Sequence, residues 1–314
     1  MPTYDEIITR GSPTDPLIPD TIVNSVIEDM PKASVLLNRA RRVQLTNKTG
    51  RQPVLSALPA AYWVNGDTGM KQTTKAEWDN VTITAEELAA IVVIPDAYFD
   101  DASLPLWDQI RPLLVEAIGL KVDQAGLFGV DKPASWPTAV VPAAVATGNT
   151  VTAGDNDDFG VDVAELGELM AGQGYAINGF AARPGLQWRL VGLRNEQGTP
   201  IYTPSLSAGA PGGLYGYPLN EVNNGAWDSD YDLLAADWSK FVVGIRQDIT
   251  FRIFSEGVIS DDSGNVVVNL MQQDAKAMRV VFRVGFQVAN PINRLEADEE
   301  SRYPAGVIEA ASGS

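Results

Sequence analysis

The residues of this chain that could do chemistry are carboxylates, because the sequence contains neither His nor Cys. Catalytic triads, cysteine dyads and zinc sites built on those two residue types are therefore excluded. Asp228, Asp230 and Asp232 have the alternating spacing of a calcium loop. An EF-hand needs Gly at the sixth position and Glu at the twelfth, but Leu233 and Ser239 stand there. A solvated acidic turn is the simpler interpretation, and we predict no metal site.

A second group of carboxylates, Asp96, Asp100 and Asp101, could mimic a catalytic pair. Capping of the long helix that follows explains them more simply, because aspartates stabilise helix N-termini. A carboxylate-dependent hydrolase, such as a glycoside hydrolase, remains the alternative of another class. The tryptophans that its cleft could use are Trp188, Trp227 and Trp238. Core packing accounts for them with less effort, so we predict no enzyme, no catalytic or cofactor-binding residue and no cofactor.

The composition is that of a globular protein with an acidic balance. Hydrophobic residues make up 45% of the 314 residues, a length that allows about two domains. The net charge is −17, so the chain repels phosphate backbones and tight general binding of nucleic acid is disfavoured. No apolar run approaches the roughly 20 residues of a membrane span, and the N-terminus lacks the layout of a secretory signal. We expect a protein that is made in the cytoplasm and does not enter a membrane.

The stretch 51–85 predicts a projecting two-stranded ribbon. Residues 53–58 form one side, and turn-forming residues occupy 65–69. On the other side, apolar residues alternate with polar ones at Trp78, Val81 and Ile83. A ribbon of this kind is marginally stable alone in water. Because Tyr62, Trp63 and Val64 add apolar surface to it, we expect a neighbouring copy of the chain to cover it.

A long helix is predicted after the strand-like run 89–95. Apolar residues repeat at three- and four-residue steps, at Trp107, Ile110, Leu114, Ile118, Val122 and Ala125. About 25 residues at ~1.5 Å each would span nearly 40 Å. Pro112 should bend the helix, and Gly126 and Gly129 should end it.

The remaining segments surround these two elements. The first 45 residues are expected to form an arm with two short helices, one over 22–27 and one over 35–37, which must pack on something else. A compact unit is predicted over 130–247, with helices at 163–170 and 184–193 and a buried strand near 175–182. Paired strands are predicted over 249–254 and 278–288. The acidic segment 296–314 is expected to be an exposed, partly disordered tail.

The order of these elements resembles that of the major capsid proteins of tailed phages, the Hong Kong 97 type fold. The ribbon and its exit resemble the extended loop and the start of the spine helix, in AYWVNGDTGMKQTTKAEWDNVTITAEELAAIVVIPDAYFDDAS. A strand–helix step that resembles the one in the family's axial domain is found in FAARPGLQWRLVGLRNEQGTPIY, followed by LYGYPL. The family's return from the axial to the peripheral domain is similar to the stretch AADWSKFVVGIRQDITFRIF. The closing strand resembles MRVVFRVGFQVANPINRL. Each motif is weak alone, and their order covers nearly the whole chain.

The resemblance implies an α+β subunit with six parts. They are an N-terminal arm (1–50), an extended hairpin loop (51–84), a peripheral domain with the spine helix (85–129), an axial domain (130–247), return strands of the peripheral domain (248–300) and a C-terminal tail (301–314). Copies would assemble into the pentamers and hexamers of an icosahedral shell. That shell would enclose double-stranded phage DNA without sequence-specific binding, and the protein would reside in the virion.

Some members of this family join a Lys of the extended loop to an Asn of a neighbouring subunit beside an acidic residue. Lys71 and Lys75 are the candidate lysines here. The closing strand KAMRVVFRVGF has neither the Asn nor the acid, and Asn290 and Asn293 read as turn residues. We therefore predict no autocatalytic cross-link.

The resemblance also bears on partners. No fused scaffolding segment precedes the arm, which implies a separate scaffolding protein or earlier cleavage. A portal and a decoration protein are further expected partners. An encapsulin-type compartment, which encloses cargo enzymes, shares the fold and remains an alternative. The proline-broken arm and the long polar ribbon tip favour the phage version.

Overall fold

The alternating apolar residues of 249–254 and 278–288 form the predicted pair of long antiparallel strands. In the computed structural model these strands are β10 (Phe241–Phe254) and β13 (Ala275–Val288), with Thr250 opposite Val281. The described residues are 34–61, 63–64, 70–71, 73–100 (without the side chains of 99 and 100), 106–156, 158–192, 202 and 213–311. The first predicted arm helix and the ribbon's turn lie outside them.

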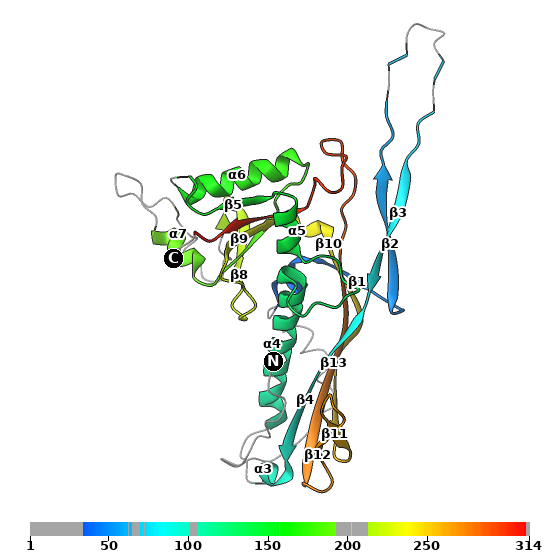
Figure 1. Ribbon diagram of the computed structural model, residues 1–314, viewed down its shortest axis with the longest axis vertical. Helices are drawn as coiled ribbons and strands as arrows, with labels where there is room; N and C mark the ends of the chain where they lie inside the picture. Colours follow the sequence, from blue (N-terminus) through cyan, green and yellow to red (C-terminus); the bar gives the residue numbers. More distant parts are fainter. Residues whose placement is uncertain are drawn as a thin grey trace.

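Two further strands complete a four-stranded sheet in the order β1-β10-β13-β4 (Figure 1). β1 (Arg41–Gln44) runs parallel to β10, and β4 (Glu86–Pro95) runs antiparallel to β13. The strand predicted over 89–95 is thus confirmed, but its predicted burial is wrong on one face. β4 ends the sheet, and its outward Ile91 is half exposed.

The predicted long helix packs along this sheet (Figure 1). Its α-helical part, α4 (Leu106–Asp123), has 18 residues and contains Pro112. A π-helical turn, Gln124–Phe128, continues it, and Gly129 ends it in the left-handed conformation at φ 80°. The predicted apolar stripe is confirmed, because all six of its residues lie in or against the main core.

Short elements flank this half of the molecule. α2 (Val35–Arg39) is the second predicted arm helix. α3 (Asp96–Asp100) follows β4. The strands β11 (Val258–Ser260) and β12 (Val266–Asn269) form a small hairpin around a turn at 261–264.

The second unit is a six-stranded sheet in the order β5-β14-β9-β6-β8-β7. Its strands are β5 (Thr150–Thr152), β6 (Gly179–Ala182), β7 (Gly213–Leu214), β8 (Tyr217–Glu221), β9 (Tyr231–Ala236) and β14 (Ala305–Glu309). Its helices are α5 (Val140–Ala146), α6 (Phe159–Gly172) and α7 (Leu186–Gly192), and a 3-10 turn, Trp238–Lys240, leads into β10. Both helices predicted here from periodicity are present.

The C-terminal segment is not the exposed tail that its composition predicts. β14 lies inside the sheet, between β5 and β9, and residues 302–308 are buried. The acidic residues 298–300 are exposed, and their charge dominates the composition of the segment. They mask the short apolar run that follows, in which Ala305, Val307 and Ile308 are fully buried.

A separate two-stranded ribbon projects away from both sheets (Figure 1). β2 (Thr49–Ala57) pairs antiparallel with β3 (Glu77–Thr84), with Gln52 opposite Val81. The predicted hairpin is confirmed. None of the described helices combines the length and apolar character needed to cross a bilayer.

Candidate assembly surfaces

The projecting ribbon exposes large apolar side chains. Trp63 is 97% exposed and Met70 is 91% exposed, and Trp78 on β3 is 66% exposed. Tyr62, which the sequence placed with Trp63, lies outside the described residues. A lone exposed apolar side chain is ordinary, but several on one projecting element mark an interaction surface.

The base of the ribbon is fixed to the body by a gap that two glycines create. Gly244 of β10 and Gly285 of β13 lie directly opposite each other. A Cβ atom at Gly285 would stand 2.6 Å from the carbonyl oxygen of Thr84, and one at Gly244 would stand 2.8 Å from Ile83 Cγ2. Leu45 and Ile83 fill this gap and are buried there. The sequence signal was a glycine inside an apolar strand, which marks a close approach of another chain segment.

A brace from the segment after β13 holds the ribbon from a second side. The backbone N–H of Ile292 donates to the carbonyl oxygen of Leu55 at 3.1 Å. The guanidinium of Arg294 donates to the carbonyl oxygen of Pro59 at 2.6 Å. The ribbon is therefore anchored at its base by the glycine gap and again near the end of β2 by this brace, and Trp63 lies beyond both sets of contacts.

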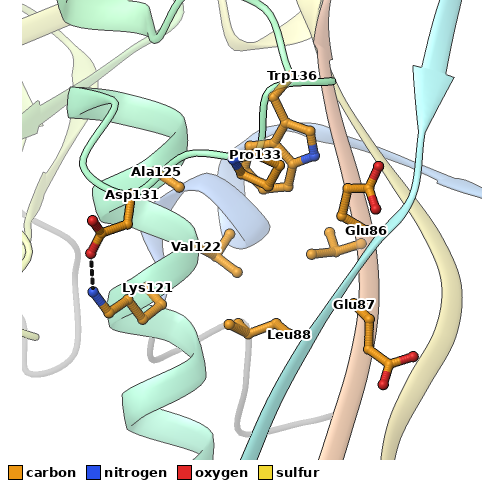
Figure 2. Close-up of a pocket in the computed structure, with 10 residues that line it drawn as sticks. Glu86, Glu87, Leu88, Lys121, Val122, Ala125, Asp131, Pro133 and Trp136 are labelled. Carbon is orange, nitrogen blue, oxygen red and sulfur yellow. Dashed lines mark hydrogen bonds and ion pairs between the residues drawn. The ribbon is translucent and has the colours of Figure 1, made fainter. Parts of the chain in front are cut away.

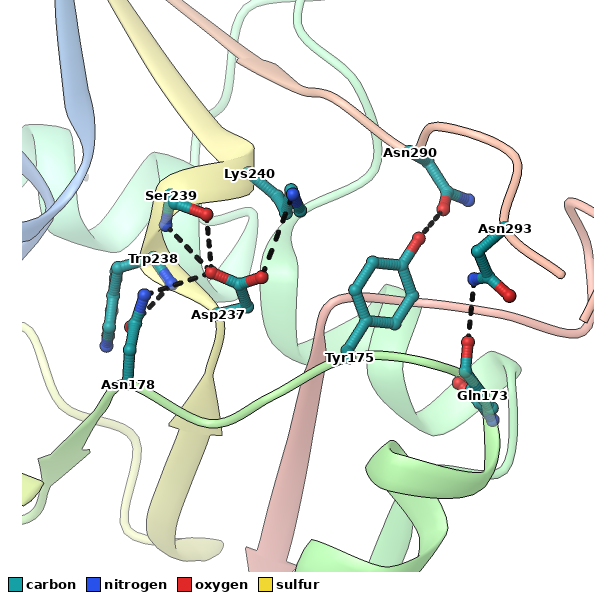
Figure 3. Close-up of polar contacts among 9 residues, drawn as sticks. All are labelled: Gln173, Tyr175, Asn178, Asp237, Trp238, Ser239, Lys240, Asn290 and Asn293. Atoms are coloured by element: carbon teal, nitrogen blue, oxygen red, sulfur yellow. Dashed lines mark hydrogen bonds and ion pairs between the residues drawn. The ribbon is translucent and has the colours of Figure 1, made fainter. Parts of the chain in front are cut away.

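The same segment is joined to the six-stranded unit by polar contacts (Figure 3). The side-chain amide of Asn293 donates to the carbonyl oxygen of Gln173 at 2.8 Å. The hydroxyl of Tyr175 donates to the side-chain oxygen of Asn290, and burial raises the pKa of Tyr175 to about 12. The ribbon brace thus continues into the loop after α6.

A second polar cluster, also drawn in Figure 3, lies where β9 passes into β10. The carboxylate of Asp237 accepts from the amide of Asn178 at 2.9 Å and from the hydroxyl of Ser239 at 2.6 Å. The side-chain oxygen of Asn178 accepts from the backbone N–H of Trp238 at 2.9 Å. These contacts order the crossing between the two sheets.

A buried carboxylate anchors the end of the arm. Asp123 of α4 accepts from Ser34 Oγ at 2.6 Å, from the backbone N–H groups of Val35 and Leu36 at 3.1 and 3.0 Å, and from the amide of Asn224 at 2.8 Å. It therefore satisfies the orphan N–H groups of α2 from a distant helix. Burial raises the pKa of Asp123, against the lowering effect of these hydrogen bonds. Sequence analysis missed this residue because nothing in its neighbourhood marks it.

The three aspartates with calcium-like spacing do not converge on one point. The Asp232 carboxylate is buried and forms ion pairs with Arg183 at 2.8 Å and Arg189 at 2.7 Å. Asp228 accepts from the backbone N–H of Asp230 in an acidic turn. Among the residues that the structure describes, no group of three or more carboxylates is arranged to hold a metal ion.

The aspartates interpreted as caps of the long helix do not all lie at its start. Asp96 lies in the first turn of α3, not at the start of α4, and pairs with Lys276 at 3.2 Å. The side chain of Asp100 and the whole of Asp101 lie outside the described residues.

The three tryptophans that a hydrolase cleft could use have separate surroundings. Trp238 is buried in the main core, and Trp227 packs against the same core. Trp188 is 78% exposed on α7, so the prediction of core packing is wrong for this residue.

Three of the four candidate cross-linking residues, Lys75, Asn290 and Asn293, have partners within the chain. Lys75 pairs with Glu77. Asn290 also donates to the carbonyl oxygens of Glu299 and Arg302. The side-chain oxygen of Asn293 accepts from two backbone N–H groups of the turn that follows it. These contacts support a turn-forming role for the two asparagines.

A projecting ribbon with exposed apolar side chains, held on a two-sheet body, is typical of a subunit whose exposed surface is covered by other copies of the chain. Comparison with known families agrees: the model of the phage capsid family matches residues 15–294. The chain belongs to that family.

Individual relatives carry the same description. The chain is 24% identical over 238 residues to the major capsid protein of Staphylococcus phage 80alpha, covering 74% of this chain and 69% of that one. It is 24% identical over 290 residues to the major capsid protein of Klebsiella oxytoca phage phiKO2, covering 86% and 65%.

Solved structures give the same result for the fold. A chain from Microbacterium phage Oxtober96 superposes with a TM-score of 0.78 at 32% identity, over 99% of this chain and 95% of that one. The capsid of a native GTA particle gives a TM-score of 0.61 at 17% identity, over 99% and 95%, and shows the fold alone. The predicted capsid fold and capsid role are confirmed: the chain is a major capsid protein, a subunit of a phage shell.

Proposed function

We propose that this subunit builds the pentamers and hexamers of an icosahedral shell around packaged double-stranded phage DNA. The observation that carries this proposal is the 97% exposure of Trp63 on a ribbon that projects from the body. Apolar burial contributes ~25 cal/mol per Å², so covering this ribbon with a neighbouring copy favours closure. Membership of the phage capsid family supports the same conclusion.

We assign the parts of the subunit as follows. The four-stranded sheet with α4 is the peripheral domain (85–129 and 248–300), and the six-stranded unit is the axial domain (130–247). The peripheral sheet also takes in β1 from the arm and the start of β10 (241–247). The ribbon is the extended loop (51–84), and 1–50 is the arm. The axial domain also takes in Ala305–Glu309, because β14 is one of its inner strands.

The acidic balance suits a container that does not hold its contents tightly. At a net charge of −17, a wall of such subunits repels phosphate groups on average. We infer that the DNA is enclosed without sequence-specific binding. A separate scaffolding protein, a portal and a decoration protein complete the proposed set of partners. The subunit is made in the host cytoplasm, carries no enzymatic activity and forms no covalent cross-link.

Electron microscopy of the expressed protein, alone and with its neighbouring gene products, tests this proposal. We expect closed particles of uniform size, and particles purified from phage-infected cells should contain DNA. A stable monomer under all of these conditions would refute the proposal. Particles that enclose a protein cargo and no nucleic acid would favour the encapsulin-type alternative.

A further inference from the structure

A small apolar pocket lies between α4 and β4 (Figure 2). Its volume is about 160 Å³. Its lining includes Leu88 of β4, Val122 of α4, Ala125 of the π-helical turn, and Pro133 and Trp136 of the loop that follows. A cavity of ~150 Å³ with an apolar lining accommodates benzene, so this pocket has room for one aromatic ring.

The charged side chains at the rim are neutralised within the chain. Glu87 pairs with Arg283 at 2.6 Å, and Lys121 pairs with Asp131 at 2.9 Å. Glu86, the fourth charged residue of the lining, pairs with Lys48 and accepts from Ser135. No unpaired charge remains to attract an ionic ligand among these described rim residues. The pocket is therefore suited to an apolar occupant.

One unused polar group also faces this region. Trp136 is 6% exposed, and its indole N–H has no hydrogen-bond partner among the described residues. The nitrogen lies on the side of the ring towards Glu86 (Figure 2). A buried donor without a partner is costly, so the Trp136 wall is the least well satisfied part of the pocket.

We propose that this pocket receives Trp63 from the ribbon of a second copy of the chain. Trp63 is 97% exposed, and the six-membered ring of its indole has the size that the pocket accommodates. The ribbon of the same copy points away from α4 and cannot return to its own pocket (Figure 1). The inference rests on the proposed function and names the surface through which neighbouring subunits engage.

The reach of the ribbon fits this contact. Fourteen steps along the chain separate Thr49, at its base, from Trp63; at ~3.3 Å per extended residue this is at most about 46 Å. The ribbon is held to its own chain as far as Pro59, so Trp63 lies beyond this brace, where an adjacent copy can cover it.

The geometry of the contact also favours rings. The pocket includes Glu86, which follows directly after β3, so it lies at the base of its own copy's ribbon. A tip that binds the base of the next copy makes a head-to-tail contact, and contacts of this kind close into rings when the rotation permits. This is the arrangement that pentamers and hexamers require.

Disulfide trapping tests the proposal cleanly, because the chain has no native cysteine. The cysteine is placed beside Trp63, at the exposed Val64, so that the docking ring stays intact. We expect the double variant V64C/E87C to give a ladder of disulfide-linked oligomers on non-reducing gels, and dithiothreitol to abolish it. The matched control is V64C/D262C, with the second cysteine in the exposed turn between β11 and β12, and it should give no ladder. The single variants V64C and E87C should also stay monomeric on the gel.

A second pair of variants measures the contribution of the ring itself. W63A should lower the yield of particles about tenfold or more, since loss of a buried aromatic anchor costs more than the ~1.4 kcal/mol that corresponds to a factor of ten. W63F should retain most of the yield because it keeps a ring. An unchanged melting temperature for both variants would show that the subunit fold is intact.

The outcomes separate this inference from the proposed function. If V64C/E87C forms particles in micrographs but gives no ladder, or if W63A assembles like the unaltered chain, the pocket assignment is wrong and the shell function stands. If the unaltered chain forms no multi-subunit species under any of the conditions above, both are refuted.

Discussion

Substitution of Gly285 tests directly how the ribbon is held, because the end of β3 lies very close to this glycine. In Gly285→Ala the new Cβ would stand 2.6 Å from the carbonyl oxygen of Thr84 and 2.9 Å from Ile83 Cγ2. The first of these neighbours is backbone and cannot rotate away. Overpacking of this kind costs about 1–3 kcal/mol. Because about 1 kcal/mol shifts Tm by roughly 2–4 °C in chains of 150–250 residues, we expect a loss of several degrees.

The matched control is Gly172→Ala in α6, where a Cβ would meet nothing within 4 Å. That variant should be neutral or slightly stabilising, since Ala favours a helix over Gly by about 0.5–1 kcal/mol. The assay is thermal unfolding of both variants beside the unaltered chain, followed by the yield of particles. If Gly285→Ala melts with the control, the gap at the ribbon base is not a constraint and this reasoning fails.

Two further predictions concern the arm and the chemistry of the shell. Asp123→Asn replaces one carboxylate oxygen by an amide that must face two donors, and leaving those donors unsatisfied should lower the free energy of chemical unfolding by about 1–3 kcal/mol. The control, Asp262→Asn in an exposed turn, should stay within ~0.5 kcal/mol of the unaltered chain. Equal effects of the two substitutions would contradict the role of Asp123 as an anchor of the arm. Particles boiled in detergent should run as a single monomer band on a gel, because the side chains of Asn290 and Asn293 form hydrogen bonds within the chain. A ladder of oligomers that survives boiling and is lost in Lys71→Arg or Lys75→Arg would overturn this expectation.

Much of the fold follows from local patterns that a reader can see in the sequence. The stripe from Trp107 to Ala125 specifies one helix face, and the alternation around Val81 specifies one face of β3. These patterns predicted the ribbon, the long helix and the paired strands β10 and β13, because each element carries its own periodicity. The order of the elements then indicated the capsid fold.

The contacts that join these elements were beyond such patterns. Asp123 and Ser34 are 89 residues apart, and Arg294 meets Pro59 across 235 residues, so no local spacing relates them. β14 was missed for a different reason: a five-residue inner strand is too short to show a period, and the acidic run before it suggested a tail. Trp188 was expected in the core because tryptophans are usually buried. In a subunit that assembles, an exposed aromatic side chain can instead be covered by a neighbouring subunit.

The division between a fixed base and a free tip explains why this ribbon can serve assembly. At the base, the Gly244–Gly285 gap restrains the ribbon through Leu45 and Ile83, and the Arg294 brace holds it again just beyond the end of β2, so few orientations of the ribbon are open to it. At the tip, Trp63 is left in water, and its apolar surface gains free energy only when another chain covers it. If the base were loose, the conformational entropy lost on ordering the ribbon would offset part of that free energy when the contact forms. Rigidity at one end therefore increases the share of the burial energy that remains for joining subunits.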